Sequence, residues 1–310
     1  MSAVVSAAPA ASRPELITAV PVRRTGQWIS AAVVVAIVAL LVWSVATNEN
    51  LQWSVVGDYL FDGSILRGAV TTIQLTVLSM VIGVVLGVVL AVMRLSANPV
   101  LSVVSNAYLW LFRGTPVLVQ VVIWFNLALI FPTLGFGSFS VETNSVITTF
   151  GAALLALALN EAAYMAEVVR GGILSVDRGQ TEAAHALGLT GSQTMRRIVL
   201  PQAMRVIVPP TGNELVTMLK TTSLVAVIGG TEMFGVAQAI GARDFTTFPM
   251  LIVACFWYLA MTSVLSYAQS KLERRFARGT QAGIANTPGT LQRLLGSRLP
   301  ARTATPGGTR

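Results

Sequence analysis

The chain has 310 residues, of which 54% are apolar and only 11% are charged, with a net charge of +8. Soluble domains usually carry about 25% charged residues, so this composition excludes an ordinary soluble domain and indicates an integral membrane protein. The basic excess does not indicate nucleic-acid binding, because the basic residues are dispersed over several loops without interleaved aromatic side chains. One cysteine and one histidine are too few for a zinc site within the chain.

Apolar runs of about 20 residues, the length that crosses the hydrocarbon core of a bilayer, recur along the chain. The predicted fold class is therefore an all-α integral membrane protein. Six membrane-spanning helices are predicted, at residues 28–47, 68–93, 101–130, 146–169, 204–229 and 248–268.

The first predicted helix could be mistaken for a signal peptide, because Arg23 and Arg24 precede it and the small residues 44–46 end it. The leader and the apolar run are both long for a cleaved signal, so an uncleaved additional helix is expected at 28–47. Residues 1–27 and 279–310 lack a periodic apolar face and are expected to be disordered tails.

The distribution of basic residues predicts the orientation of the chain in the membrane. Under the six-helix topology, most of the 21 Lys and Arg residues lie in the two tails and in the long loop after residue 169. The loops of the opposite side carry only Arg67 and Arg243. This positive-inside pattern predicts that both termini and the long loop are cytoplasmic.

The third predicted helix contains the motif Arg113, Gly114, Thr115, Pro116. Pro116 biases Thr115 toward an extended conformation, so the motif predicts the start or a break of a helix. A structural role is expected for Arg113, with lipid phosphate, an acid on another helix or a substrate as its alternative partners.

Ionisable residues inside a membrane are costly and mark a transport pathway or a paired structural role. Glu161 follows Asn160 in the middle of the fourth predicted helix and could bind the ammonium group or a cationic side chain of a substrate; a structural bond to Lys220 is the alternative. Glu167 precedes Arg170 by three residues, which predicts an ion pair on the helix surface.

The predicted substrate path also includes hydroxyl groups of the fifth helix, which could hold a carboxylate or bond back to helix carbonyls. Glu214 is expected to begin a helix beside a break at Pro209–Pro210. The residues predicted to line the path are Asn160, Glu161, Tyr164, Thr221, Thr222 and Ser223.

The long polar loop predicts two short helices. Asp177 is a plausible N-cap of the first, and Gly188 is expected to end it in a left-handed conformation. Thr190 and Gln193 have the spacing of a capping box, which opens a second helix that runs to Leu200. The expected shape is an exposed helix-turn-helix; an ordinary pair of amphipathic interfacial helices is the alternative.

The same loop contains Glu182-Ala-Ala-His-Ala-Leu-Gly188, followed by Ile198-Val-Leu-Pro201. This spacing resembles the cytoplasmic signature of importer permeases of the ATP-binding-cassette (ABC) superfamily. The resemblance implies that residues 176–201 form a coupling loop, held by a separate ATPase. The residues implied in this coupling are Glu182, Ala183, Ala184, His185, Gly188, Arg196, Arg197, Ile198, Leu200 and Pro201.

Four further passages resemble the polar amino acid permeases, which import histidine, glutamine, glutamate and arginine: residues 66–76, 112–120, 162–173 and 201–224. The resemblance covers about residues 65–275 and implies the type I importer permease fold, with a transport subunit rather than an enzyme. Many relatives have Asp or Asn at the position of Thr221, a difference that leaves the charge of the substrate open.

The resemblance also implies the partners: a second permease subunit, identical or paralogous, two ATPase subunits and an extracytoplasmic solute-binding protein. It places the chain in a bacterial plasma membrane, in contact with membrane lipid. The chain lacks a phosphate-binding G-x-x-x-x-G-K-[ST] motif, so ATP and Mg are expected on the partner ATPase and no cofactor on this chain. An opine or another small polar solute is an alternative substrate. A secondary transporter usually shows an internal repeat with broken helices, which this sequence lacks.

Overall fold

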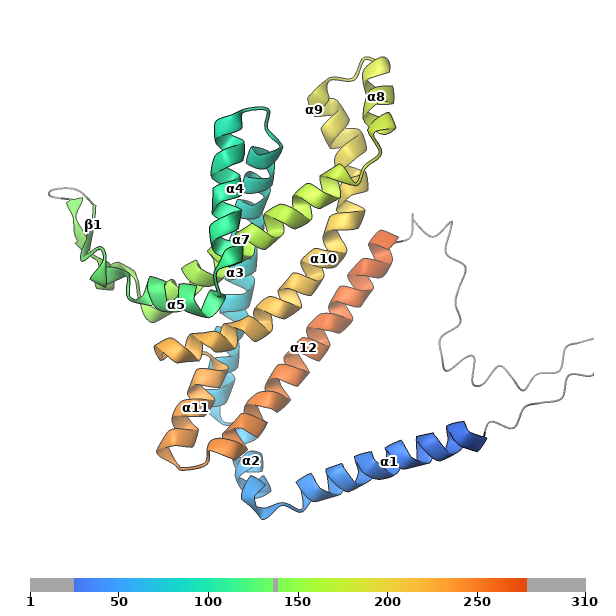
Figure 1. Ribbon diagram of the computed structural model, residues 1–310. Coiled ribbons are helices and arrows are strands. Elements are labelled where there is room, and N and C mark those ends of the chain that lie inside the picture. Colours follow the sequence, from blue (N-terminus) through green and yellow to red (C-terminus); the bar gives the residue numbers. More distant parts are fainter. Residues whose placement is uncertain (1–24, 136–138, 278–310) are drawn as a thin grey trace, which may run out of the picture. The chain divides into compact units, whose positions relative to one another are not determined.

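The computed structural model describes residues 25–135 and 139–277 (Figure 1). The predicted C-terminal tail, residues 279–310, lies outside the described residues, as does the predicted N-terminal tail up to residue 24. Residues 25–27, which were expected to belong to that tail, are instead the first residues of helix α1. The chain divides into two units, residues 1–52 and 53–310, and each is described by itself.

The first unit contains α1 (Thr25–Ala46) and a short 3-10 helix, η1 (Glu49–Leu51). The described side chains of α1 are exposed from Gly26 to Ala46, and the helix is apolar on all sides. A helix without a polar face is stable where lipid or protein surrounds it. Its length and composition are sufficient to cross a membrane, as predicted for residues 28–47.

The second unit is a helical bundle with a short hairpin, in which β1 pairs antiparallel with β2. Its long helices are α3, α7, α10 and α12, and α3 packs most extensively against α7. The elements are α2 (Trp53–Leu60), α3 (Gly63–Leu95), α4 (Pro99–Gly114), α5 (Val117–Phe125), η2 (Leu127–Leu129), β1 (Thr133–Leu134), β2 (Val141–Glu142), α6 (Thr143–Val146), α7 (Thr149–Leu174), α8 (Arg178–Ala186), α9 (Gly191–Thr194), the π-helical turn η4 (Met195–Val199), α10 (Leu200–Thr221), η5 (Thr222–Ile228), α11 (Met233–Arg243) and α12 (Thr247–Ala277).

Four helices of the described residues are long and apolar enough to cross a membrane, and up to six spans result if each of two bent pairs counts as one. One pair is α4 with α5, bent by 100°. The other pair joins residues 191–228 to α11, with a bend of 43°. The predicted all-α membrane fold is therefore confirmed, and the count of six is reached when each bent pair is taken as one span.

The expected break at Pro209–Pro210 is wrong. Both prolines lie inside α10, so Glu214 occupies the middle of a helix rather than its beginning. A spanning helix tolerates proline where neighbouring helices compensate for the lost hydrogen bonds. Helix α10 has such neighbours, because it packs against α3, α7 and α12.

Two glycines allow the close approach of α3 and α7. A Cβ atom added at Gly83 would lie 2.6 Å from Cγ of Glu161, and one added at Gly87 would lie 2.6 Å from Cβ of Met165. Small residues spaced four apart are a common device for bringing membrane helices together. Gly83 therefore fixes where Glu161 lies in the bundle.

Substitution of Gly83 by alanine is expected to destabilise the bundle by about 1–3 kcal/mol, the usual cost of an extra methyl group in a packed core. Glu161 must move to make room, because both its Cβ and its Cγ lie within 3 Å of the new atom. The melting temperature of the detergent-purified protein measures the effect. Gly171→Ala is the matched control, since no atom lies within 4 Å of its added Cβ, and an equal loss in both variants would contradict the packing argument.

Candidate substrate cavity and coupling loop

A polar cavity of about 610 Å³ lies where the α4–α5 break meets α7 and α10. It brings together the whole Arg113–Pro116 motif and four residues of the predicted path. The residues that line it are Arg113, Gly114, Thr115, Pro116, Val117, Leu157, Asn160, Glu161, Tyr164, Glu214, Thr217, Met218 and Thr221.

The α4–α5 break forms one wall of this cavity, and hydrogen bonds hold it in shape. Thr115 is extended (φ −117°, ψ 142°), as expected of a residue before proline. Gln120 donates to the carbonyl oxygens of Phe112 (2.9 Å) and Thr115 (3.2 Å), which the end of α4 leaves without helical partners. Asn160 also donates to the Phe112 carbonyl (2.9 Å).

Asn160 is therefore engaged in holding the break. Its amide nitrogen has a second bond, to Oε1 of Gln120 (3.2 Å). Gln120 was not among the predicted site residues, because its only signal in the sequence is an amide within an apolar run, four residues after Pro116. Both amides position the wall of the cavity.

Glu161 is the feature of the cavity that most needs a partner. Its residue is only 4% exposed, and its Oε1 atom is buried without a hydrogen-bond partner among the described residues. Such a group is costly unless it is satisfied. The alternative of a bond to Lys220 is not formed, because Lys220 is exposed and lines a separate pocket with Ser223.

The hydroxyls of the predicted path bond back to their own helix. Thr221 donates to the Thr217 carbonyl (2.9 Å), Thr222 to that of Leu219 (2.7 Å), and Ser223 to that of Lys220 (2.7 Å). Thr221 lines the polar cavity. Thr222 is completely buried, and Ser223 faces the separate pocket, so neither reaches this cavity.

Three arginines converge on Glu167. Oε1 of Glu167 accepts hydrogen bonds from Arg94 and from Nη1 of Arg113 (3.1 Å), whereas Oε2 accepts two from Arg170 (3.1 Å each). The predicted pair with Arg170 is thus confirmed, and the other two arginines come from α3 and α4. The guanidinium of Arg113 also lies over the ring of Tyr164, 5.4 Å from its centroid.

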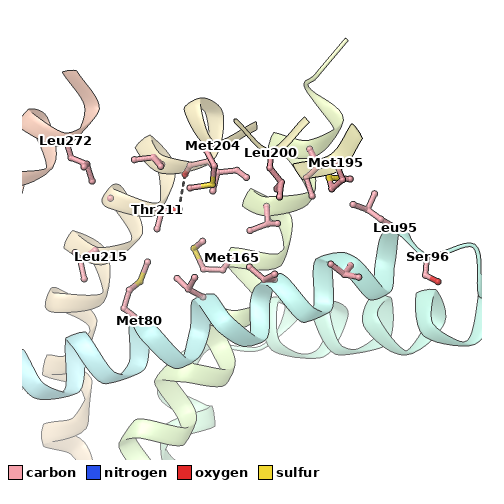
Figure 2. A pocket seen from close by; sticks show the side chains of 18 residues that line it. Met80, Leu95, Ser96, Met165, Met195, Leu200, Met204, Thr211, Leu215 and Leu272 are labelled. Atoms are coloured by element: carbon pink, nitrogen blue, oxygen red, sulfur yellow. Dashed lines mark hydrogen bonds between the residues drawn. The ribbon is translucent and has the colours of Figure 1, made fainter. Parts of the chain in front are cut away.

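A larger, apolar groove of about 840 Å³ lies between α3, α7 and α10 (Figure 2). Methionine and leucine side chains such as Met80, Met165 and Leu215 line it, and no charged side chain of residues 25–135 and 139–277 does. It offers no partner for the charged ends of an amino acid. The smaller cavity is therefore the better candidate for a polar solute.

The predicted coupling loop, residues 176–201, has the local structure expected from its caps. Oδ1 of Asp177 accepts from the backbone nitrogen of Gly179 (2.7 Å), at the start of α8. Gly188 has φ +80°, and Thr190 and Gln193 form both bonds of the capping box. Figure 1 shows α8 and α9 side by side beyond the beginning of α10.

The end of the loop differs from expectation in one respect. The second helix does not stop at Leu200, because η4 leads directly into α10, which begins at Leu200 and has Pro201 in its first turn. Proline is tolerated at this position, because the first turn of an α-helix needs no hydrogen bond from its backbone nitrogen. The preceding π-helical turn η4 accommodates the change from π-type to α-type hydrogen bonding.

Most of the predicted coupling residues are exposed: Glu182, Ala183, His185, Gly188, Arg196, Arg197 and Pro201. Ile198 and Leu200 are half-buried, and Ala184 is buried. Leu187 was not among the predicted coupling residues, and it is 83% exposed at the tip of the loop. An exposed leucine between polar helices offers an apolar contact to a partner.

The comparisons with known proteins agree with the sequence motifs. The family model described as "Binding-protein-dependent transport system inner membrane component" matches residues 83–278. The chain is 46% identical to the arginine transport system permease protein of Corynebacterium glutamicum, over 87% of this chain and 86% of that protein. It is 38% identical to the L-cystine transport system permease protein of Bacillus subtilis, over 69% of this chain and 87% of that protein.

Two solved structures share the fold. A crystal structure of an amino acid ABC transporter with histidines has a TM-score of 0.60 and 36% identity, covering 68% of this chain and 94% of that one. An inward-facing methionine ABC transporter has a TM-score of 0.56 and 22% identity, covering 69% of this chain and 96% of that one. The second likeness concerns the fold alone.

Proposed function

Because the chain belongs to the family of binding-protein-dependent transport system inner membrane components, we propose that its polar cavity binds and passes an amino acid with a cationic side chain. The family consists of multi-pass permease subunits of ABC importers, so this chain is a transport subunit rather than an enzyme. ATP hydrolysis belongs to separate subunits, and amino acid import is favoured over an opine permease or a secondary transporter.

The single observation that carries the choice of substrate is the buried carboxylate of Glu161, whose Oε1 has no partner among the described residues. Glu214 is a second acid on the same cavity, contributed by α10. Two ionised carboxylates in a membrane-embedded cavity repel each other, and either a proton on one of them or a cation between them relieves the repulsion, so the pair favours a cationic ligand. The similarity to an arginine permease supports a guanidinium or ammonium group as that cation.

The coupling loop is proposed to dock on the ATPase. Support comes from α8, which exposes Glu182, Ala183 and His185, and from Leu187 at the tip. Two such loops, one from each permease subunit, would move together when the ATPase subunits close, and the helices would rock between outward-open and inward-open states. ATP and Mg would be bound by those partners, with both termini of this chain on their side of the membrane.

Competition for uptake tests the proposed substrate class. Cells that carry the intact importer are expected to take up labelled arginine, and excess lysine or ornithine should compete, because each carries a side-chain cation for Glu161 and Glu214. Citrulline has nearly the shape of arginine without its charge and should compete about tenfold less well, the equivalent of about 1.4 kcal/mol for the lost ionic interaction. Equal competition by citrulline or by glutamate would overturn the cationic assignment and leave the permease assignment intact.

A further inference from the structure

Arg113 lines the polar cavity, and within the described part of the chain only its Nη1 group donates a hydrogen bond, to Glu167. We propose that Arg113 binds the α-carboxylate of the substrate and that Glu167 positions it for this contact. The proposal rests on the proposed function, because it assigns the two ends of an amino acid within the same cavity. It adds a specificity-determining residue and a positioning residue to Glu161 and Glu214.

Arg113 is held in place by Glu167, but this contact does not use all of its hydrogen-bond donors. It lies in the last turn of α4, its side chain is 42% exposed, and Nη1 donates to Oε1 of Glu167 (3.1 Å). The face of its guanidinium lies over Tyr164. Its Nε and Nη2 groups have no hydrogen-bond partner among the described residues, so one edge remains open. An open guanidinium edge matches a carboxylate in a two-bond geometry that lysine cannot reproduce.

Glu167 keeps Arg113 in place while the open edge of its guanidinium binds a ligand. Oε1 of Glu167 accepts from Nη1 of Arg113 and from Arg94, and Oε2 accepts two bonds from Arg170. These partners hold the carboxylate in one orientation, so the Arg113 side chain is held beside the cavity that it lines. One carboxylate also leaves an excess of positive charge among three arginines, which favours an anion at the exposed one.

The charges of the cavity then match both ends of an amino acid. Arg113 lines the same cavity as Glu161 and Glu214. The cavity therefore has a basic residue at the α4–α5 break and acidic residues on α7 and α10. A carboxylate at Arg113 directs the ammonium and side-chain cations toward the two acids. This arrangement predicts that a cation without a carboxylate binds more weakly than the amino acid.

Equilibrium binding to the purified permease–ATPase complex, without its binding protein, tests this assignment. The probes are labelled arginine and agmatine, the amine that remains when arginine loses its carboxylate. The wild type is expected to prefer arginine by about 10- to 100-fold, the range for one hydrogen-bonded charge pair. Arg113→Gln should lower arginine binding to the level of agmatine while leaving agmatine binding unchanged.

Further variants separate binding from positioning. Arg113→Lys, which keeps the charge and loses the fork, should retain part of the preference, and Glu167→Gln should reduce it through the loss of positioning. Arg94→Gln is the matched comparison, because Arg94 shares Oε1 of Glu167 but does not line the cavity, and it should keep the preference. Size-exclusion profiles show which variants assemble.

Two results would overturn the role of Arg113: a preference for arginine that persists in Arg113→Gln, or an equal fall in agmatine binding, which would indicate a purely structural residue. If the assembled wild type binds neither probe, the proposed cavity function itself fails. Anionic lipid added to the assay provides one more arm. If anionic lipid abolishes the preference of the wild type for arginine over agmatine, the open edge of Arg113 binds headgroup phosphate rather than substrate.

Discussion

Glu161→Gln is expected to reduce arginine uptake by about 10- to 100-fold, because the amide cannot form the charge-assisted bonds that a buried carboxylate offers a cation. The substitution preserves the shape of the side chain, so its packing against Gly83 should persist. Initial rates of labelled arginine uptake, corrected for the amount of protein in the membrane, measure the effect.

The control for this prediction is Asp58→Asn, which removes an exposed carboxylate on α2 that does not line the cavity. It should leave uptake unchanged. Citrulline competition provides a second check, since Glu161→Gln should weaken arginine relative to citrulline. Arginine uptake at the wild-type rate in Glu161→Gln, with normal assembly, would assign this carboxylate a structural role.

Gly188→Pro is expected to abolish productive coupling to the ATPase. The native φ of +80° cannot be reached by proline, whose ring fixes φ near −65°. The substitution also removes the bond from the Gly188 backbone nitrogen to the His185 carbonyl (2.9 Å). Because α8 is then turned away from its native direction, substrate-stimulated ATP hydrolysis should fall by more than about tenfold, equivalent to roughly 1.4 kcal/mol of coupling free energy.

Gly191→Pro is the matched control in the same loop. Gly191 is the first residue of α9, a position at which proline is favoured. Thr190 before it is already extended (φ −71°, ψ 158°), which is the conformation that a residue preceding proline prefers. This variant should couple normally. Membrane insertion of both variants is checked by extraction and blotting. Loss of Gly188→Pro from the membrane, or equal loss of coupling in the two variants, would count against a specific role of the left-handed turn.

The sequence predicts best the elements that depend on local patterns. The long apolar runs place α1, α3 and α7 within several residues of their observed bounds, since length and hydropathy alone define a span. The start of α12 is placed equally well, but the helix continues past the predicted end at residue 268 to Ala277. The caps at Asp177, Gly188 and Thr190 follow equally from short-range chemistry. Pro116 indicated the break between α4 and α5, but not its bend of 100°.

Contacts between distant residues could not be predicted in this way. Arg94 and Arg113 reach Glu167 across 73 and 54 residues of sequence, and no local pattern specifies that convergence. The engagement of Asn160 with the Phe112 carbonyl is of the same kind. At Pro209–Pro210 a local pattern was present but misleading. Two prolines predict a helix break, and the packing of α10 against its neighbours keeps the helix continuous there.

The central claim is that the polar cavity holds the substrate. The most direct measurement is a cryo-electron microscopy map of the assembled importer, with ATP turnover arrested and arginine in excess, compared with a map without arginine. The account predicts added density between Arg113 and the two acids, Glu161 and Glu214, with the guanidinium of the ligand toward the acids. An empty cavity, with arginine density elsewhere along the path, would contradict it.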